Sequence, residues 1–412
     1  MKTNTINNLL LILFTIYPVS ILAGNLFINL NIFLISIIFI SGLLLKKFDF
    51  KNQKITFYLI SFFFITLLIN LFFSNNLILS YPRVIKVFFI TFFVLSFGYI
   101  LNNLNEKKIQ SLYKVWTFIF LLVTLDLLIE YFNGQNIIGL SSVFPGKRLG
   151  SFTGTESVIG HYYLGFSLIV LSYAKLFLKI KNINLLLALI FIAFSFLIGE
   201  RANFIRTFII ISLYSFMMHE TKLRFKFLGI ILIISFFVTF LNFNQNYKTR
   251  YYNEIGLVFQ KGITTFLEES NYGAHRNVAM EIFKDNPIFG VGIKNFRVES
   301  SNSKYDNLDH KQNYLRVSTH PHELYYELMS ETGLFGLLSF LIFIVTSLYF
   351  SIKNYFIFKN VFQLSSILFI LSAILPILPS GSFLSTFSSS IFWINYAIMM
   401  GYNKGKILNF KF

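Results

Sequence analysis

The sequence THPHELYYELMSETGLFGLLSF, residues 319–340, joins a polar segment with two histidines to an apolar run. Pro321 favours the first turn of a helix, and three glutamates follow at four-residue spacing from Glu323 onward, which places them on one helical face. An apolar run such as residues 333–350 is typical of a membrane-spanning helix. We therefore expect His322 at the outer mouth of such a helix, where a histidine is a candidate for chemistry.

The composition of the whole chain indicates a membrane protein. Of its 412 residues, 55% are hydrophobic and 19% aromatic, and the mean hydropathy is +0.66. This is more apolar surface than a water-soluble globular protein can bury. Cysteine is absent, which excludes disulfides, iron–sulfur clusters and thiolate zinc sites. The predicted fold class is an all-α polytopic membrane protein.

The formal net charge of +17 follows the expected membrane topology. If the chain starts on the inner side and crosses at each apolar run, the inner segments hold 19 Lys and Arg residues against Asp49, Glu106 and Glu220. This is the positive-inside pattern. The basic balance therefore indicates orientation, with both termini inside, and predicts no nucleic-acid partner.

Twelve apolar runs are read as membrane spans. Nine precede the polar stretch 244–330, in which acidic and basic residues are nearly balanced, and three follow it. We therefore predict a single integral membrane domain, residues 1–412, with one large outer loop subdomain inserted between spans nine and ten. The predicted spans are residues 9–23, 26–45, 56–73, 84–101, 115–132, 158–178, 184–199, 202–218, 227–243, 333–350, 361–378 and 383–400.

The fifth predicted span carries Asp126 and ends near Glu130. A carboxylate inside a membrane is costly, which makes Asp126 a candidate site residue. A hydrogen-bonded residue between helices, close to the membrane surface, is the alternative.

Arginines occur on the outer side, where the positive-inside pattern expects few. Arg148 precedes span six, Arg201 lies in the turn between spans seven and eight, and Arg276 lies in the long loop. Arg206 follows Arg201 by five positions and so points to a different face of its helix. Because a guanidinium keeps its charge and forks two donors onto phosphate oxygens, such a group suits a diphosphate.

A neutral histidine at a helix N-terminus can accept a proton from an attacking hydroxyl. His322 and the outer arginines would then hold a base beside a lipid-diphosphate leaving group. The alternative is that the arginines pair with Glu200, Glu156 or lipid headgroups, and that His322 only caps a helix.

The sequence lacks the motifs that several other kinds of enzyme chemistry require. HELYY at His322 has Tyr326 where the HExxH zinc helix needs a second histidine. A metal on His320 and His322 would need ligands that the sequence does not nominate. Neither a phosphate-binding P-loop nor a G-x-S-x-G elbow occurs. We therefore expect no metal and no cofactor.

Four segments, in order over roughly residues 145–345, together resemble the O-antigen ligase and O-antigen polymerase family. In that family the histidine is normally followed by Asn and the loop arginine by an aromatic residue; Glu323 and Met280 replace them here. The four segments are RLGSF at 148–152, the Glu200–Arg201 turn, Arg276 followed by NPIFGVGIKNF at 286–296, and His320-Pro-His322 followed by GLFG at 333–336.

The resemblance implies a GT-C-like fold and metal-independent, inverting glycosyl transfer at the periplasmic face of a bacterial inner membrane. The donor would be a glycan on undecaprenyl diphosphate. The acceptor hydroxyl would lie on the lipid A core in a ligase, or on another lipid-linked glycan in a polymerase. By position, Arg201 and Arg276 would hold the diphosphate and His322 would activate or orient the acceptor hydroxyl. Secondary candidates are Arg148, Arg206, His320 and Glu323.

Two functions from other classes stay open at this stage. A polysaccharide flippase or exporter would also need many spans and basic residues that face a diphosphate. It should bear them in a central cavity open to both sides, whereas the residues singled out here gather at the outer end. A membrane-anchored binding protein without chemistry is the third possibility.

Overall fold

The computed structural model describes residues 3–156, 158–178, 180, 182–218 and 222–403. Every regular element within these ranges is helical, as predicted. The α-helices are α1 Thr3–Thr15, α2 Tyr17–Leu22, α3 Asn25–Leu44, α4 Lys54–Leu71, α5 Leu77–Asn103, α6 Glu106–Asn133, α7 Ile159–Phe177, α8 Ile183–Leu197, α9 Arg201–Met217, α10 Leu223–Phe243, α11 Gln245–Glu269, α12 Asn271–Asp285, α13 Phe296–Glu299, α14 Leu324–Phe358, α15 Val361–Ala373 and α16 Thr386–Gly401, with short 3₁₀ helices at Lys51–Gln53, Ser151–Glu156, Ser303–Tyr305 and Asn313–Leu315.

Among the described residues, six helical segments are long and apolar enough to cross a membrane: α3, α4 with the preceding 3₁₀ turn, α5, α6, α10 and α14. The chain is therefore a multi-pass membrane protein. A helix, or for the first run the pair α1 and α2, coincides with each of the twelve predicted apolar runs; the number of crossings stays a prediction. Parts of the predicted basic inner segments, residues 179, 181, 219–221 and the tail 404–412, lie outside the described ranges.

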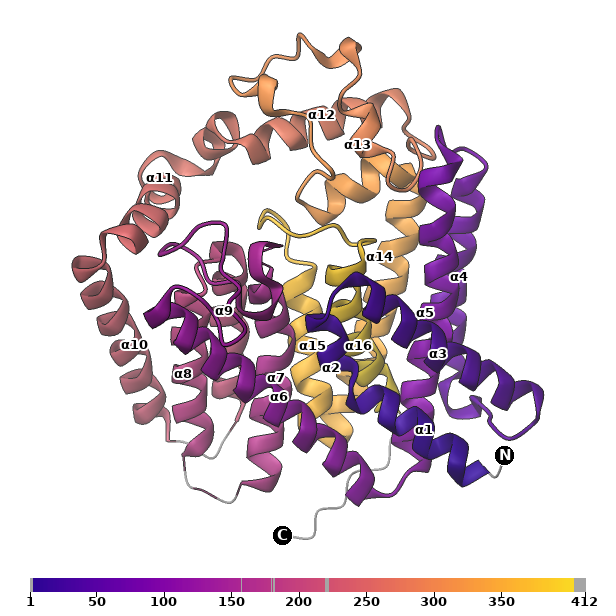
Figure 1. Cartoon of the computed structure of the whole chain (residues 1–412). Coiled ribbons are helices and arrows are strands. Elements are labelled where there is room, and N and C mark those ends of the chain that lie inside the picture. Colours follow the sequence, from indigo (N-terminus) through magenta and orange to yellow (C-terminus); the bar gives the residue numbers. More distant parts are fainter. Residues whose placement is uncertain (1–2, 157, 179, 181, 219–221, 404–412) are drawn as a thin grey trace.

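The helices form a bundle around α7, α15 and α16 (Figure 1). Nearly every residue of α7 and α16 is buried, because helices surround both. On one side of this centre lie α8, α9 and α10, and on the other lie α3, α4 and α5 (Figure 1). α10 exposes large apolar side chains such as Ile231 and Leu232, as a lipid-facing helix does.

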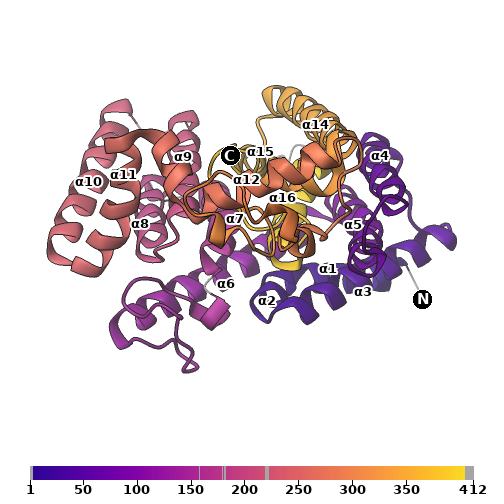
Figure 2. The same cartoon turned by 90° about the horizontal axis from the view of Figure 1, so that it is seen from above.

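The chain between α10 and α14 lies across one end of the bundle. α11, α12 and α13 occupy this end (Figure 1), and the view from above places α12 over the central helices (Figure 2). α12 begins at a side-chain cap, since the Ser270 hydroxyl accepts a hydrogen bond from the N–H of Gly273. This cap fixes the start of the helix that carries Arg276.

α14, which follows the histidine segment, differs from the prediction in two ways. Pro321 is not in its first turn, because the helix begins at Leu324 and Glu323 is its N-cap, accepting from the N–H of Tyr326 at 3.0 Å. A carboxylate oxygen there satisfies a donor that the first turn leaves free. The helix is also interrupted at Gly333, where the backbone has a φ of +64°.

Residues 286–292 (NPIFGVG) fill the break in α14. The backbone N–H groups of Leu334 and Phe335 donate to carbonyls of this segment at 2.8 and 3.1 Å. A Cβ on Gly333 would lie 2.3 Å from the carbonyl oxygen of Ile288. Only glycine provides both the left-handed backbone and this close approach. The break thereby fixes the start of α14 against the loop that follows α12.

Candidate functional site

Three histidines and a tyrosine cluster at the start of α14. The ring of His322 lies 4.0 Å from that of His320, 5.2 Å from that of His275 and 5.6 Å from that of Tyr272, measured between centroids. His275 and Tyr272 come from α12, so the cluster joins α12 to the segment before α14. The backbone of His322 is left-handed, with φ of +58°. Such a conformation in a non-glycine residue costs free energy and is common at functional sites.

The histidines are held in their neutral forms. Burial lowers the pKa of His322 to about 3, with smaller contributions from His320 and His275. Burial and then the charge of Lys294 lower the pKa of His320 to about 4. The pKa of His275 is also lowered by burial. A neutral imidazole has a free acceptor nitrogen, which is the form that a proton-accepting base needs.

The connection between α15 and α16, residues 374–385, packs against this cluster. The N–H of Ser380 donates to the carbonyl oxygen of His322 at 2.8 Å, and Nε2 of His320 lies 3.3 Å from the carbonyl oxygen of Ser380. The backbone of Ile377 is left-handed, with φ of +77°, which is an unusual conformation for a β-branched residue. We call this segment the 374–385 loop.

Arg206 and Arg276 both reach this loop from other helices. Arg206 donates from Nε, Nη1 and Nη2 to the carbonyls of Ser372, Pro379 and Leu378 at 3.1, 2.8 and 3.0 Å. Arg276 donates from Nη2 to the carbonyl of Ile377. Its guanidinium also lies 5.8 Å from the centroid of the Tyr326 ring. The two arginines thus bind neutral backbone carbonyls, which do not neutralise the charge of a guanidinium. All three nitrogens of the Arg206 guanidinium donate to such carbonyls.

Glu323 lies among these arginines. Its side chain is buried, and its Oε1 has no hydrogen-bond partner among the described residues. Burial raises its pKa, while the charges of Arg276 and Arg206 lower it. Within the described chain neither arginine comes within 4 Å of this carboxylate as an ion pair. Glu323, and not His322, caps the helix.

Arg201 and Arg148 form a second group with Arg250, around the turn at Gly199. Arg250 donates from Nε to the carbonyl of Gly199 at 2.6 Å, and Nη1 of Arg201 lies 3.5 Å from the carbonyl oxygen of Arg250. Arg148 approaches the carboxylate of Glu200 at 3.8 Å. Burial, followed by the charges of Arg201 and Arg148, lowers the pKa of Arg250 to about 10. Mutual repulsion of this kind marks a region that would be stabilised by an anion.

Tyr272 connects the two groups. Its ring lies 5.6 Å from that of His322, and its phenol interacts electrostatically with Arg201 and Arg250. His322, His320, Glu323, Arg206 and Arg276 therefore lie around one region, at the end of the bundle that α12 covers. Arg201 and Arg148 belong to the neighbouring group, which Tyr272 connects to this region.

Residues 183–341 match the family model described as O-antigen ligase. Over this segment the chain is similar to the O-antigen ligase family. The matched segment includes Arg201, Arg206, Arg276, both histidines of the 319–340 stretch and the break at Gly333. The family implies glycosyltransferase-type chemistry on lipid-linked glycans. No curated protein matches the chain.

Asp126 and Glu130, upstream of the O-antigen ligase segment, hold a loop together. Asp126 accepts from the hydroxyl of Ser151 and from the N–H of Ile137 at 2.9 Å. Glu130 accepts from the N–H groups of Gly150 and Ser151 at 3.0 and 2.6 Å. Both carboxylates thus anchor the loop that carries Arg148, which is the structural alternative considered for Asp126.

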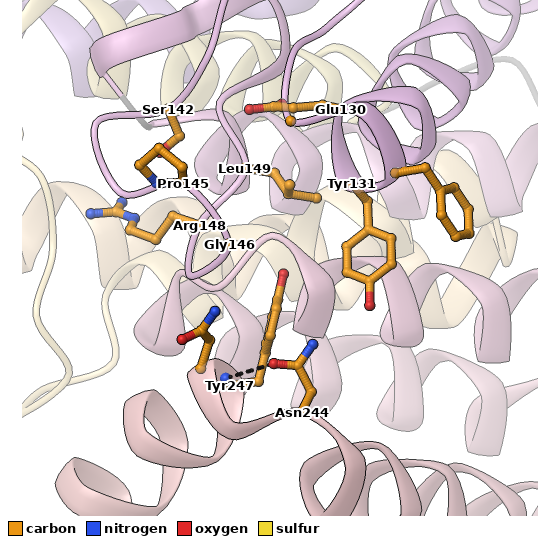
Figure 3. Close-up of a pocket in the computed structure, with 12 residues that line it drawn as sticks. Glu130, Tyr131, Ser142, Pro145, Gly146, Arg148, Leu149, Asn244 and Tyr247 are labelled. Carbon is orange, nitrogen blue, oxygen red and sulfur yellow. Dashed lines mark hydrogen bonds between the residues drawn. The ribbon is translucent and has the colours of Figure 1, made fainter.

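A cavity of about 400 Å³ lies beside this same loop, away from the histidines. It is lined by the end of α6, the loop before α7 and the start of α11, with Tyr131 and Tyr247 among its walls. In the close-up the Arg148 side chain is directed away from Tyr131 (Figure 3). None of the histidines lines it, so this cavity is not the candidate catalytic site of the O-antigen ligase domain.

Within the described ranges, no group of three or more His, Asp or Glu side chains has an arrangement that could hold a metal ion. The ring of His322 is stacked on that of His275, with an interplanar angle of 29°, and is tilted by 45° from that of His320. The expectation of metal-independent chemistry stays a prediction.

The sequence did not single out His275, Arg250, Lys294 or the 374–385 loop. A signal existed for two further residues, Arg83 and Lys86, which lie at the outer end of a predicted span where the positive-inside pattern expects few cations. No comparable signal exists for the loop, because its role depends on contacts with residues far away in sequence.

Proposed function

We propose that the protein is an O-antigen ligase-type glycosyltransferase. It would transfer a glycan from undecaprenyl diphosphate to a sugar hydroxyl of the lipid A core, without a metal and with inversion. The observation that carries this proposal is a neutral imidazole, His322, inside the segment matched by the family model, whose ring packs against Tyr272 and His275 of the helix that also carries Arg276.

In the proposed reaction, the acceptor hydroxyl oxygen attacks the anomeric carbon of the donor sugar. The new C–O bond forms as the bond to the diphosphate oxygen breaks, and the hydroxyl proton passes to His322. The diphosphate leaves with both electrons of the broken bond, and Arg201 and Arg276 stabilise its charge. A single displacement of this kind inverts the anomeric configuration.

With the low pKa that it has in the absence of substrate, His322 is a weak base. Binding of the donor would raise this pKa. A diphosphate next to the cluster favours the protonated imidazole and so raises its pKa. Donor binding would thereby bring His322 closer to the pKa that general-base catalysis requires at neutral pH.

The proposed location is the bacterial inner membrane, with twelve spans, both termini in the cytoplasm and a GT-C-like arrangement. Residues 244–330 would form a periplasmic loop subdomain, and the site would face the periplasm. The inner charge excess of the sequence supports this orientation. So does the position of Arg276 on α12 and of His322 against it, because α12 lies across one end of the bundle (Figure 1).

The test is a gel profile of surface glycan in a null strain complemented with His322→Ala or Arg276→Ala. We expect each variant to insert into the membrane and to leave the core unmodified, with lipid-linked polymer accumulating. His310→Ala is the matched control, because this histidine is in the same loop but its ring nitrogens bond the Leu267 carbonyl and the Gln312 N–H and no residue of the cluster. A normal glycan ladder from either site variant would reject the assignment. Core carrying one repeat unit would indicate a polymerase, and continued transfer by both variants would leave a flippase or binding protein.

A further inference from the structure

A second basic group contacts residues 382–389, which follow the part of the 374–385 loop that Arg206 and Arg276 hold. We propose that Arg83, Lys86 and Lys294 form a second anion-binding subsite, which takes a phosphate group of the acceptor lipid. The identity of this anion as an acceptor phosphate rests on the proposed function; the existence of the subsite does not.

Two of these cations come from the outer end of α5. Arg83 and Lys86 are three positions apart, so they lie on the same helical face. Arg83 Nη1 donates to the Thr386 hydroxyl at 3.3 Å, and Lys86 Nζ donates to the Ser389 hydroxyl at 3.1 Å and the Ser385 carbonyl at 3.3 Å. Both side chains therefore point at the first turn of α16.

The third cation comes from the segment that follows the break-filling residues. Lys294 is buried, its backbone is left-handed with φ of +66°, and its Nζ donates to the Ser382 hydroxyl at 3.2 Å. Burial lowers the pKa of Lys294, while the nearby carboxylates of Glu327 and Glu331 raise it. A buried lysine in a strained backbone conformation is costly, and such costs are typical of functional sites.

The charge of this group is not neutralised by direct ion pairs. The hydrogen-bond partners of the three cations are hydroxyl and carbonyl oxygens, and no carboxylate of the described residues lies within 4 Å of them. Glu327, the nearest acid, already accepts from the Ser382 hydroxyl and the Phe383 N–H. Moreover, cations at a helix N-terminus are repelled by the helix dipole. An incoming anion would relieve both sources of repulsion.

The 374–385 loop separates this group from the arginines of the candidate catalytic site. Its first part is held by Arg206 and Arg276, and its second part meets Lys294 at Ser382 and Lys86 at Ser385, while Arg83 bonds Thr386 directly after it. The histidines lie at the boundary, since the charge of Lys294 acts on His320. The proposed transferase binds two lipid substrates next to its base, and the two basic groups would provide one position for each.

The experiment measures equilibrium binding of radiolabelled inorganic pyrophosphate to the full-length protein in neutral detergent. We expect two binding sites in the wild type. Lys86→Gln combined with Arg83→Gln should remove one site, and Arg201→Gln should remove the other. Lys284→Gln, an exposed loop lysine paired with Glu281, is the matched control and should keep both. A double variant that retains both sites, or a single wild-type site that depends only on Arg201, would overturn the proposal.

Further measurements separate the source of the anion from the reaction. Competition with phosphatidylglycerol in nanodiscs should leave the second site at least about tenfold selective for pyrophosphate. Equal competition would assign the site to bulk lipid and overturn the acceptor assignment.

In transfer assays, Lys86→Gln should raise the KM for the acceptor about tenfold and leave the KM for the donor within about twofold of the wild-type value. A change in KM confined to the donor would also overturn the acceptor assignment. Because binding needs no turnover, two sites without any transfer would reject only the proposed function.

Discussion

Replacement of Arg206 by lysine keeps the charge at this position and removes the fork, so it tests whether Arg206 is a support of the 374–385 loop. The three guanidinium nitrogens donate to three separate carbonyls, those of residues 372, 378 and 379. A single ammonium cannot reach all three in these directions. We therefore expect the loop to open more often in Arg206→Lys, while the helices around it stay folded.

The magnitude follows from the carbonyls left without partners. The Ser372 carbonyl keeps the N–H of Leu375 as a donor, so the loss falls on the carbonyls of Leu378 and Pro379. A carbonyl without a partner costs about 1–3 kcal/mol, so these two cost about 2–6 kcal/mol, of which we take the lower part, about 2–3 kcal/mol. If exchange proceeds through loop opening, this corresponds to a rise in amide exchange of roughly 30- to 150-fold, since 1.4 kcal/mol is a factor of ten. Two loop amides report it, Ser380, bonded to the His322 carbonyl, and Phe383, bonded to Glu327.

The assay is hydrogen–deuterium exchange followed by mass spectrometry of peptides that cover residues 374–385. Peptides that cover residues 286–292, held in the break of α14, are the internal control and should exchange as in the wild type. Unchanged exchange in the loop would refute the reasoning, because it would mean that the three hydrogen bonds do not hold the loop. Equally fast exchange in both regions would show general destabilisation and would refute it as well.

Three further predictions follow from the same contacts. Gly333→Ala should destabilise the protein by about 3 kcal/mol and so lower its melting temperature. About 1–2 kcal/mol comes from the strain of a left-handed alanine, and the rest from weakened hydrogen bonds to residues 286–292. Gly256→Ala is the control and should not lower the melting temperature, because a Cβ there would have no neighbour nearer than 3.8 Å. The free energy of unfolding should fall as the pH drops from about 6.5 towards 4. In this range the histidines of the unfolded chain bind protons, whereas the folded His320 and His322, with pKa values of about 4 and 3, do not. His320→Gln should flatten this pH dependence in melting curves recorded at several pH values. In steady-state kinetics, the acid limb of kcat should have a higher pKa than that of kcat/KM, because bound donor raises the pKa of His322; identical limbs would contradict this.

The helical architecture could be predicted from the sequence because apolar runs of span length leave the backbone few alternatives in a membrane. Boundaries were less predictable. The eleventh run was expected to continue to residue 378, but α15 ends at Ala373, since Pro376 and Pro379 cannot continue a helix. The break at Gly333 was also missed, because it depends on a segment about 45 residues upstream that supplies the acceptor carbonyls.

The candidate site was predictable in its residue types and less so in their roles. The pattern placed cations and a histidine on the outer side, and His322, His320, Arg276, Arg206 and Glu323 do lie around one region. The sequence could not show that Arg206 binds carbonyls more than 160 positions away. The sequence also could not show that Arg83 and Lys86 of the second basic group bond α16. A basic residue in or next to an apolar run gives no indication of which helix it contacts.

The most direct test of the central claim is the single-turnover rate of glycan transfer by purified His322→Ala protein, with pyrophosphate binding measured on the same sample. A general base contributes about 10²–10⁴-fold, so the rate should fall at least about 100-fold while pyrophosphate binding stays unchanged. His310→Ala should keep the wild-type rate. Transfer by His322→Ala at the wild-type rate would contradict the account, and so would loss of pyrophosphate binding together with the rate.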